Sequence, residues 1–243
     1  MILEIDIGNT RVKWRIVSGS KIIFRDTQSS QNVLRDGRLA IDDQYPFSEA
    51  RLCCVAGSAL GILVCGQLSA DFDIPVSVAR VSEVAGSVTC GYENPTMLGI
   101  DRWLGILACY ERATRDFVVV DAGTAMTVDI VETNGLHLGG YICPGQSLLR
   151  NSLSSVLHKF RLDAVKKYRE SSAPSNTEEA IIRGCLISSI ALIERICDAG
   201  SRDLYITGGD AIILLEELSL EANFIEDLVL DGLSATGLVF DVF

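Results

Sequence analysis

Residues 6–10 read Asp-Ile-Gly-Asn-Thr, and residues 121–125 read Asp-Ala-Gly-Thr-Ala. Each stretch ends an apolar run and leads into another extended segment. Aligning residues 2–10 with residues 117–125 gives an offset of 115, close to half of the 243-residue chain. A single Asp-x-Gly at a strand end is most often only a hairpin turn. Two copies with matching flanks predict a chain built from two similar halves.

The residue types in these turns suit the binding of a phosphate. Glycine lets the backbone turn sharply and approach a bulky anion, and nearby N–H groups and hydroxyls can then hold phosphate oxygens. An aspartate beside the turn can hold a cation that neutralises the phosphates. Two such turns facing each other would make a nucleotide cleft.

The composition favours a globular protein with a substantial core. The chain is 48% hydrophobic, with a mean hydropathy of +0.30. Its 32 acidic and 21 basic residues give a net charge of −11. That charge argues against a nucleic-acid partner or an anionic membrane surface. Any bound phosphate must therefore be neutralised locally.

The eight cysteines include no Cys-x-x-Cys pair, and several lie in apolar stretches, so we expect a reduced, cytoplasmic protein. The two histidines, His137 and His158, lack ligand-spaced neighbours and are interpreted as structural or surface residues. The sequence opens on a strand-like segment, not on a secretory signal. Residues 52–70 carry no charge, but glycines interrupt them, so a buried strand, a turn and a helix are expected there.

The order of expected elements is also repeated. Alternating apolar residues predict three short antiparallel strands at the start of each half, followed by a helix and by a strand that ends at a glycine turn. These later strands end at residues 56–58 and at residues 207–210. We expect a helix over about 146–159 and a longer one from Thr177, as its N-cap, to about residue 199. Residues 161–176 suggest a connector, and residues 29–50 are ambiguous. Together these patterns predict duplicated α/β domains with mixed sheets.

Between the halves, residues 94–103 read Asn-Pro-Thr-Met-Leu-Gly-Ile-Asp-Arg-Trp. This loop brings Asp101 and Arg102 to the start of an expected helix. Asp101 could simply cap that helix. Alternatively, its carboxylate could accept a proton from a substrate hydroxyl while Arg102 holds a carboxylate or a phosphate.

Taken together, five motifs resemble those of the type III pantothenate kinases, in the expected order and over nearly the whole length. They are Asp6–Thr10, Gly99–Arg102, Asp121–Asp129, Gly139–Gly145 and Thr207–Ala211. The resemblance implies two duplicated ribonuclease-H-like domains, residues 1–115 and 116–243, with mixed five-stranded sheets, as in acetate kinase, sugar kinases, Hsp70 and actin. It also implies a homodimer that phosphorylates pantothenate with ATP, Mg²⁺ and a monovalent cation, K⁺ or NH₄⁺.

The resemblance also implies roles for individual residues. Asp101 matches the general base, Asp121 the monovalent-cation ligand, and Asp6 a carboxylate directed to the Mg²⁺-bound phosphates. ATP contacts are implied for Asp6, Ile7, Gly8, Asn9, Thr10, Arg11, Val12, Lys13, Thr124, Gly208 and Gly209. Pantothenate contacts are implied for Tyr92, Gly99, Ile100, Asp101, Arg102 and Thr177.

Two other functions remain open at this point. A phosphohydrolase on the same fold would use Asp101 or Asp129 to position water. A non-catalytic nucleotide-binding regulator would keep the fold without the chemistry. The pairing of Asp101 with Arg102 favours the kinase over the regulator. Phosphate release from ATP without pantothenate would favour the hydrolase.

Overall fold

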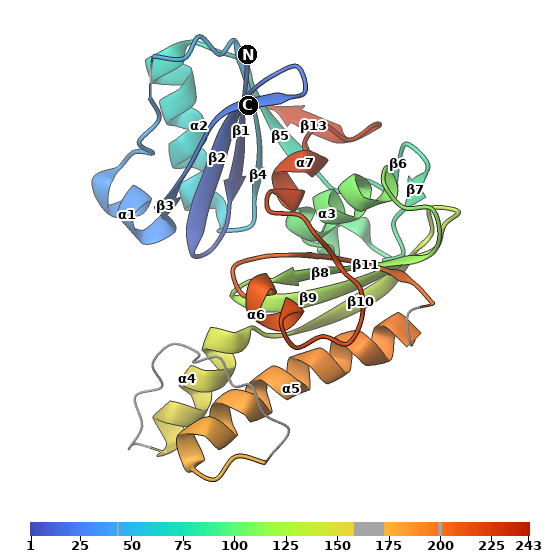
Figure 1. Cartoon of the computed structure of the whole chain (residues 1–243). Coiled ribbons are helices and arrows are strands. Elements are labelled where there is room, and N and C mark those ends of the chain that lie inside the picture. Colours follow the sequence, from blue (N-terminus) through green and yellow to red (C-terminus); the bar gives the residue numbers. More distant parts are fainter. Residues whose placement is uncertain (43, 158–172, 199–200) are drawn as a thin grey trace. The chain divides into compact units, whose positions relative to one another are not determined.

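A computed structural model describes residues 1–42, 44–157, 173–198 and 201–243 (Figure 1). The chain divides into two compact units. Unit 1 comprises residues 1–112, 134–137 and 227–243, and unit 2 comprises residues 113–133 and 138–226. The expected division of the chain into residues 1–115 and 116–243 stays a prediction. The two units are instead defined by how the chain packs, and the C-terminal segment packs against the N-terminal sheet.

Unit 1 is built on a six-stranded mixed sheet of order β13-β5-β4-β1-β2-β3. The first three strands are antiparallel, and β4 and β5 run parallel to β1. The strands are β1 (Ile2–Ile7), β2 (Arg11–Ser18), β3 (Lys21–Ser29), β4 (Glu49–Cys54), β5 (Val76–Arg80) and β13 (Val239–Val242). The helices and the minor elements of this unit are α1 (Ser30–Asp36), α2 (Ser58–Phe72), β6 (Val84–Ala85), β7 (Val88–Thr89), the 3₁₀ turn η1 (Pro95–Met97), α3 (Ile100–Tyr110) and α7 (Leu228–Gly232).

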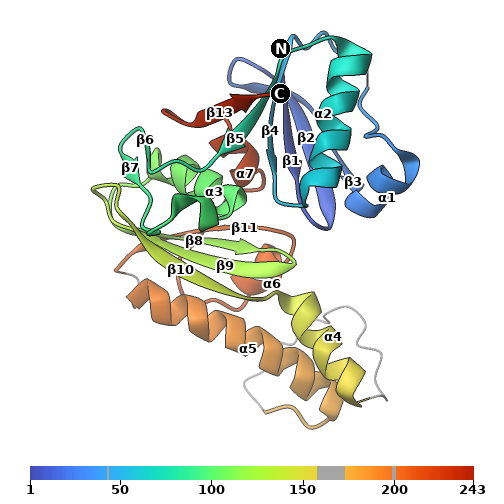
Figure 2. The ribbon, with the colours of Figure 1, turned by 180° about the vertical axis from the view of Figure 1, so that it is seen from behind.

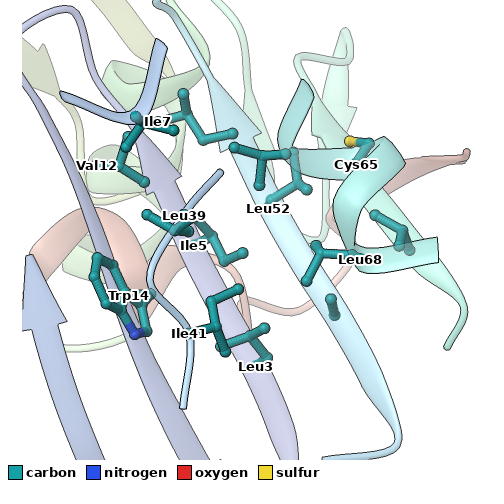
Figure 3. Packing of buried hydrophobic residues seen from close by; sticks show 14 of the residues in the cluster. Leu3, Ile5, Ile7, Val12, Trp14, Leu39, Ile41, Leu52, Cys65 and Leu68 are labelled. Atoms are coloured by element: carbon teal, nitrogen blue, oxygen red, sulfur yellow. The ribbon is translucent and has the colours of Figure 1, made fainter. Parts of the chain in front are cut away.

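Alternation along β1 separates the two faces of this sheet. Leu3, Ile5 and Ile7 point into the core beneath α1 and α2, where Trp14 and Leu68 also lie (Figure 3). The intervening residues of β1 point to the face that α3 and α7 cover (Figures 1 and 2). The position of Asp6 on this second face follows directly from the period of the strand.

A buried ion network joins this second face to α7. Glu4 is fully buried and accepts a 2.6 Å hydrogen bond from Nε of Arg15, whose Nη1 donates to Asp231 at 2.7 Å. The hydroxyl of Ser234 donates to the second Glu4 oxygen at 2.9 Å. Buried charges require such complete pairing, because the loss of one partner leaves the other desolvated and uncompensated. The network ties the C-terminal segment to β1 and β2.

Unit 2 repeats the plan with a five-stranded sheet of order β10-β9-β8-β11-β12. Its strands are β8 (Phe117–Ala122), β9 (Ala125–Val131), β10 (His137–Pro144), β11 (Asp203–Thr207) and β12 (Asn223–Phe224). The helices are α4 (Gln146–Leu157), α5 (Thr177–Cys197) and α6 (Ala211–Leu215), and α5 runs along the sheet (Figure 2). Val118, Val120 and Ala122 face the core with α5 and α6. These three positions lie 115 residues after the core positions of β1, so the repeat holds residue by residue.

The duplicated α/β fold is therefore confirmed, with two corrections and one addition. The first sheet has six strands rather than five, because β13 pairs with β5 at its edge. The ambiguous residues 29–50 contain α1. The N-cap of α5 is Asn176, whose side chain accepts from the N–H of Glu179 at 2.9 Å, and Thr177 is the first helical residue.

Some expectations fall partly or wholly on undescribed residues. His158, the end of the expected helix at 158–159 and most of the expected connector lie outside the described residues. Residues 49–72 form the expected strand, turn and helix. Within the described residues, no helix is both long and apolar enough to span a bilayer.

Candidate active site

Asp6 lies near the end of β1, between two neighbouring strands. The register places Lys13 of β2 and Cys53 of β4 directly opposite it. Directly opposite side chains share one face of a sheet, so all three point to the side that α3 covers. The Cys53 thiol lies 3.5 Å from Oδ1 of Asp6 and donates to it. Sequence reasoning missed Cys53, because only the parallel pairing of β1 with β4 places it opposite Asp6.

Burial dominates the electrostatics of Asp6. Removal of the carboxylate from water raises its pKa to about 6, although the nearby charge of Lys13 and the Cys53 thiol both act in the opposite direction. The charge of Asp101 raises the pKa further, so unit 1 brings these two predicted carboxylates together. A cation placed beside Asp6 would relieve this unfavourable desolvation.

The turn after Asp6 is held by the start of α1. The Ser30 hydroxyl donates to the Gly8 carbonyl at 2.6 Å, and the Ser30 N–H donates to the Thr10 carbonyl at 3.0 Å. A Cβ on Gly8 would lie 2.9 Å from the Arg11 carbonyl oxygen, so the tight turn favours glycine. Asn9, Thr10 and Arg11 are exposed at its tip. Their exposure leaves this turn accessible to a ligand.

Asp101 is the second residue of α3, and the N-cap position belongs to Gly99. Oδ1 of Asp101 accepts from the N–H of Arg102 at 2.8 Å. A Cβ on Gly99 would lie 2.5 Å from that same oxygen, so glycine here leaves room for the carboxylate. Asp101 therefore lies in the first turn of α3 without being its N-cap residue.

Arg102 and Tyr92 form one side-chain cluster in unit 1. Nη1 of Arg102 donates to the Tyr92 hydroxyl at 2.8 Å, and the guanidinium carbon lies 5.5 Å from the centre of the tyrosine ring. Arg102 is buried, whereas Tyr92 is partly exposed. The structure thus brings together Tyr92, Asp101 and Arg102 of the expected pantothenate segment.

In unit 2, Asp121 is placed like Asp6 in unit 1. Thr127 of β9 and Thr207 of β11 lie directly opposite it. The turn that follows is closed by a 3.2 Å hydrogen bond from the Gly123 N–H to the Ala125 carbonyl. Thr124 lies in this turn and is exposed. Two hydroxyl residues thus take the places that Lys13 and Cys53 take beside Asp6.

Two glycines allow neighbouring loops to pack against the Asp121 turn. Gly208 has a φ of +99°, and a Cβ there would lie 2.5 Å from the Ala122 carbonyl. A Cβ on Gly145 would lie 2.1 Å from the Gly123 carbonyl oxygen. Gly209, in contrast, has open space where its Cβ would be. The predicted residues Asp121, Thr124, Gly208 and Gly209 are therefore gathered around one turn.

Asp210 is a further residue that sequence reasoning left unassigned. Its N–H donates to the Ala122 carbonyl at 2.9 Å. Desolvation raises the pKa of its carboxyl, while Arg150 and the Gln146 N–H at the start of α4 counteract that rise. Asp210 therefore links the loop after β11 to the first turn of α4.

Thr177 lies in a different part of unit 2. It lines an apolar groove of about 370 Å³ between α4 and α5, together with Leu149, Leu153, Ala180, Ile181, Gly184, Cys185 and Ser188. Asp121 and Gly208 are not among these lining residues. The structure therefore does not place Thr177 with the glycine turn of its own unit.

The donor set fits a nucleotide that carries its own Mg²⁺. Mg²⁺ prefers one or two carboxylates together with phosphate oxygens and water over a site made only of protein ligands. Among the described residues there is no group of three or more His, Cys, Asp or Glu side chains that could hold a metal ion. The desolvated Asp6 carboxylate beside a glycine turn fits a Mg²⁺ that is held by one carboxylate together with phosphate oxygens and water.

Two similar mixed sheets, of six and five strands, each carry an aspartate near the end of the first strand and a glycine turn after it, an arrangement consistent with duplicated ribonuclease-H-like domains. A family model of type III pantothenate kinase matches residues 2–199. The chain therefore belongs to the type III pantothenate kinase family.

Individual relatives agree with this assignment. The chain is 34% identical to a type III pantothenate kinase of Pseudomonas paraeruginosa, over 96% of the chain and 98% of the relative. It is 37% identical to one of Chromohalobacter salexigens, over 96% and 86%. A solved Campylobacter jejuni structure, described as a Baf family transcriptional activator, is 26% identical with a TM-score of 0.60, and covers 95% of this chain and 94% of that one.

Proposed function

We propose that this chain phosphorylates pantothenate with ATP to give 4'-phosphopantothenate, the first step of coenzyme A biosynthesis. The observation that carries the proposal is the arrangement in unit 1. There Asp101 lies near the desolvated Asp6 and is followed directly by Arg102, which is bonded to Tyr92. One carboxylate can serve the alcohol and the other the cation that accompanies the phosphates.

Each residue has a distinct role in the proposed reaction. Asp101 accepts the proton of the primary hydroxyl of pantothenate. The hydroxyl oxygen bonds to the γ-phosphorus, and ADP leaves. Arg102 binds the pantothenate carboxylate, and Tyr92 fixes the direction of that guanidinium. Asp6 and the turn at Gly8–Thr10 hold the phosphates. Phosphoryl transfer depends mainly on alignment and charge stabilisation, and these residues supply both.

The residues of unit 2 have ligand roles of their own in the proposed reaction. Asp121 holds K⁺ or NH₄⁺, Thr124 binds a phosphate oxygen, and Gly208 and Gly209 leave room for the adenosine. When bound, Mg²⁺ and the monovalent cation neutralise the negative charge on the phosphates. The open space beside Gly209 supports this role, because a flat ring needs an unobstructed backbone.

The protein acts as a homodimer in this proposal, and Thr177 contributes to the pantothenate site of the partner subunit. Its place in the apolar groove between α4 and α5 supports that assignment. We also place the protein in the cytoplasm, without a nucleic-acid or membrane partner. All eight cysteines are free thiols, and burial raises the pKa of Cys65 and Cys197 to about 11.

The alternatives are less well supported. Asp129 is only 1% exposed, so it is poorly placed to position solvent water for a hydrolase. A regulator of the kind suggested by the Campylobacter jejuni description would not need a carboxylate in the first turn of α3 beside the Arg102–Tyr92 pair. The net charge of −11 also disfavours DNA binding.

A coupled ADP-release assay separates these functions. Purified protein is supplied with ATP, Mg²⁺ and K⁺, with and without pantothenate. The kinase releases ADP only when pantothenate is present and forms one phosphopantothenate for each ADP. Equal release without pantothenate would identify a hydrolase. ATP binding without turnover in either mixture would identify a regulator.

A further inference from the structure

His137 is a buried histidine that contacts the proposed pantothenate residues of unit 1 without belonging to them. It is the first residue of β10, and its exposed fraction is 0%. The imidazole stacks on the ring of Tyr92, with the ring centres 5.9 Å apart and the planes 11° apart. Nδ1 accepts a 3.4 Å hydrogen bond from the N–H of Gly91. One side chain thus contacts both the ring of Tyr92 and the backbone just before it.

The segment that carries His137 is anchored to the strand before Tyr92. The Thr89 N–H donates to the Gly135 carbonyl at 2.9 Å, and Thr89 forms a parallel bridge with Leu136. Gly135 has a φ of +90°, and a Cβ there would lie 2.0 Å from the Ser87 carbonyl oxygen. Only glycine allows this approach, so the turn before β10 is shaped to bring His137 beneath Tyr92.

Arg102 contacts the same tyrosine, Tyr92. It donates to the hydroxyl of Tyr92, and its guanidinium lies near the ring. An arginine that binds a carboxylate must present its planar donors in a fixed direction. Because Tyr92 is one of the partners of this guanidinium, a shift of the Tyr92 ring would change the direction in which Arg102 points.

We propose that His137 is a positioning residue for pantothenate recognition, acting through Tyr92 on Arg102. The inference rests on the proposed function. The histidine contributes two separable contacts, a stacked ring and an unprotonated Nδ1 acceptor, and the imidazole combines both in one rigid side chain. Its effect falls on pantothenate binding and not on the nucleotide.

Two variants separate the contacts. His137→Phe keeps a stacking ring and removes the acceptor, whereas His137→Asn keeps an acceptor and removes the ring. Each should raise the pantothenate KM by roughly 3–10-fold, which corresponds to the loss of one hydrogen bond or one aromatic pair. The ATP KM should stay within about twofold of wild type, because the nucleotide contacts are untouched. Val88→Ala, which opens a cavity at the buried position of β7, is the matched control for local destabilisation and should leave both constants unchanged.

A double-mutant cycle with Tyr92→Ala tests the route of the effect. If His137 acts through Tyr92, its variants should raise the pantothenate KM of the Tyr92→Ala protein by less than about twofold. Independent, multiplying effects would overturn the inference while leaving the kinase assignment intact. A wild-type protein that releases no pantothenate-dependent ADP would overturn the proposed function, and the inference with it.

A measurement on a protein with native His137 covers the case in which the variants fail to fold. The chain has only two histidines, so ¹⁵N-histidine labelling of His158→Gln leaves the signals of His137 alone. Nδ1 of His137 should resonate as an unprotonated nitrogen, and its shift should change when pantothenate is added. A protonated Nδ1, or signals unchanged at saturating pantothenate, would contradict the proposal.

Discussion

A Cβ atom on Gly208 would lie 2.6 Å from Oδ1 of Asp121. The aspartate at the end of β8 therefore keeps its place only because the residue after β11 has no side chain. The two segments are joined by the parallel register that pairs Asp121 with Thr207. A substitution at Gly208 should thus displace the carboxylate of Asp121.

Gly208→Ala should destabilise unit 2 and displace Asp121. The positive φ alone costs about 1–3 kcal/mol for a residue with a Cβ, and the clash with the Ala122 backbone adds to it. Gly209→Ala is the matched control, because its Cβ would enter open space and should change the free energy of unfolding by less than about 0.5 kcal/mol. Denaturant unfolding of the two ligand-free variants compares them. Equal free energies of unfolding for the two variants would contradict the close packing at Gly208.

Asp121→Asn should remove the dependence on a monovalent cation. In wild type at saturating Mg²⁺, replacement of K⁺ by tetramethylammonium at equal ionic strength should lower turnover by roughly tenfold or more, since the phosphates lose a neutralising charge. The variant should have low turnover in both salts. Initial rates across a K⁺ titration measure this. Full wild-type activity in Tris or Na⁺ alone would count against the assignment.

Asp6→Asn should stabilise the ligand-free protein at neutral pH. The pKa of Asp6 is about 6 in the folded state, against an ordinary value of 3.8. Between these values the folded protein binds more protons than the unfolded chain, so the contribution of Asp6 to stability falls as pH rises through about 4 to 6. The Tm of the variant should therefore exceed that of wild type at pH 7, and the difference should shrink toward pH 4.

The exposed Asp26→Asn is the control for this comparison, because its Tm should follow wild type across the same pH range. Thermal melts of the three proteins without nucleotide or metal give the comparison directly. A variant that is less stable than wild type at pH 7 would show that the Asp6 carboxylate is already compensated in the ligand-free protein.

Ile187→Glu should separate the proposed dimer into monomers. Ile187 is 56% exposed on α5, whereas Ile190 is 9% exposed and packs in the core of unit 2. A glutamate at Ile187 would place a charge in the interface without disturbing that core, so the Tm of the monomer should change little. The pantothenate KM should rise if Thr177 serves the partner's site.

Ile62→Glu is the control for added charge, because Ile62 is similarly exposed on α2 of unit 1. Light scattering and kinetics on the same samples distinguish the outcomes. A wild-type monomer would refute the dimer, and a monomeric variant with a normal pantothenate KM would refute the shared site. Ile190→Glu is unsuitable for this test, because it would break the core.

The repeated motif predicted most of the fold, because strand alternation and glycine turns are local signals. It could not show that β13 joins the first sheet, since the pairing of Val239–Val242 with β5 is a long-range contact. Of the site, the aspartates and glycines were visible in the sequence. Thr127 and Thr207 lay within recognised motifs, but their places opposite Asp121 depend on pairing across strands, as does the place of Cys53 opposite Asp6. His137 was interpreted as structural or surface, since its contact with Tyr92 depends on the turn at Gly135.

The most direct test of the central claim is the turnover of Asp101→Asn with saturating ATP, Mg²⁺, K⁺ and pantothenate. Asparagine can still accept the hydrogen bond from the Arg102 N–H, so the fold and pantothenate binding should persist. Formation of 4'-phosphopantothenate by wild type, together with a kcat lower by roughly 10²–10⁴-fold in the variant, is the predicted result. A variant with near-normal kcat would contradict the account.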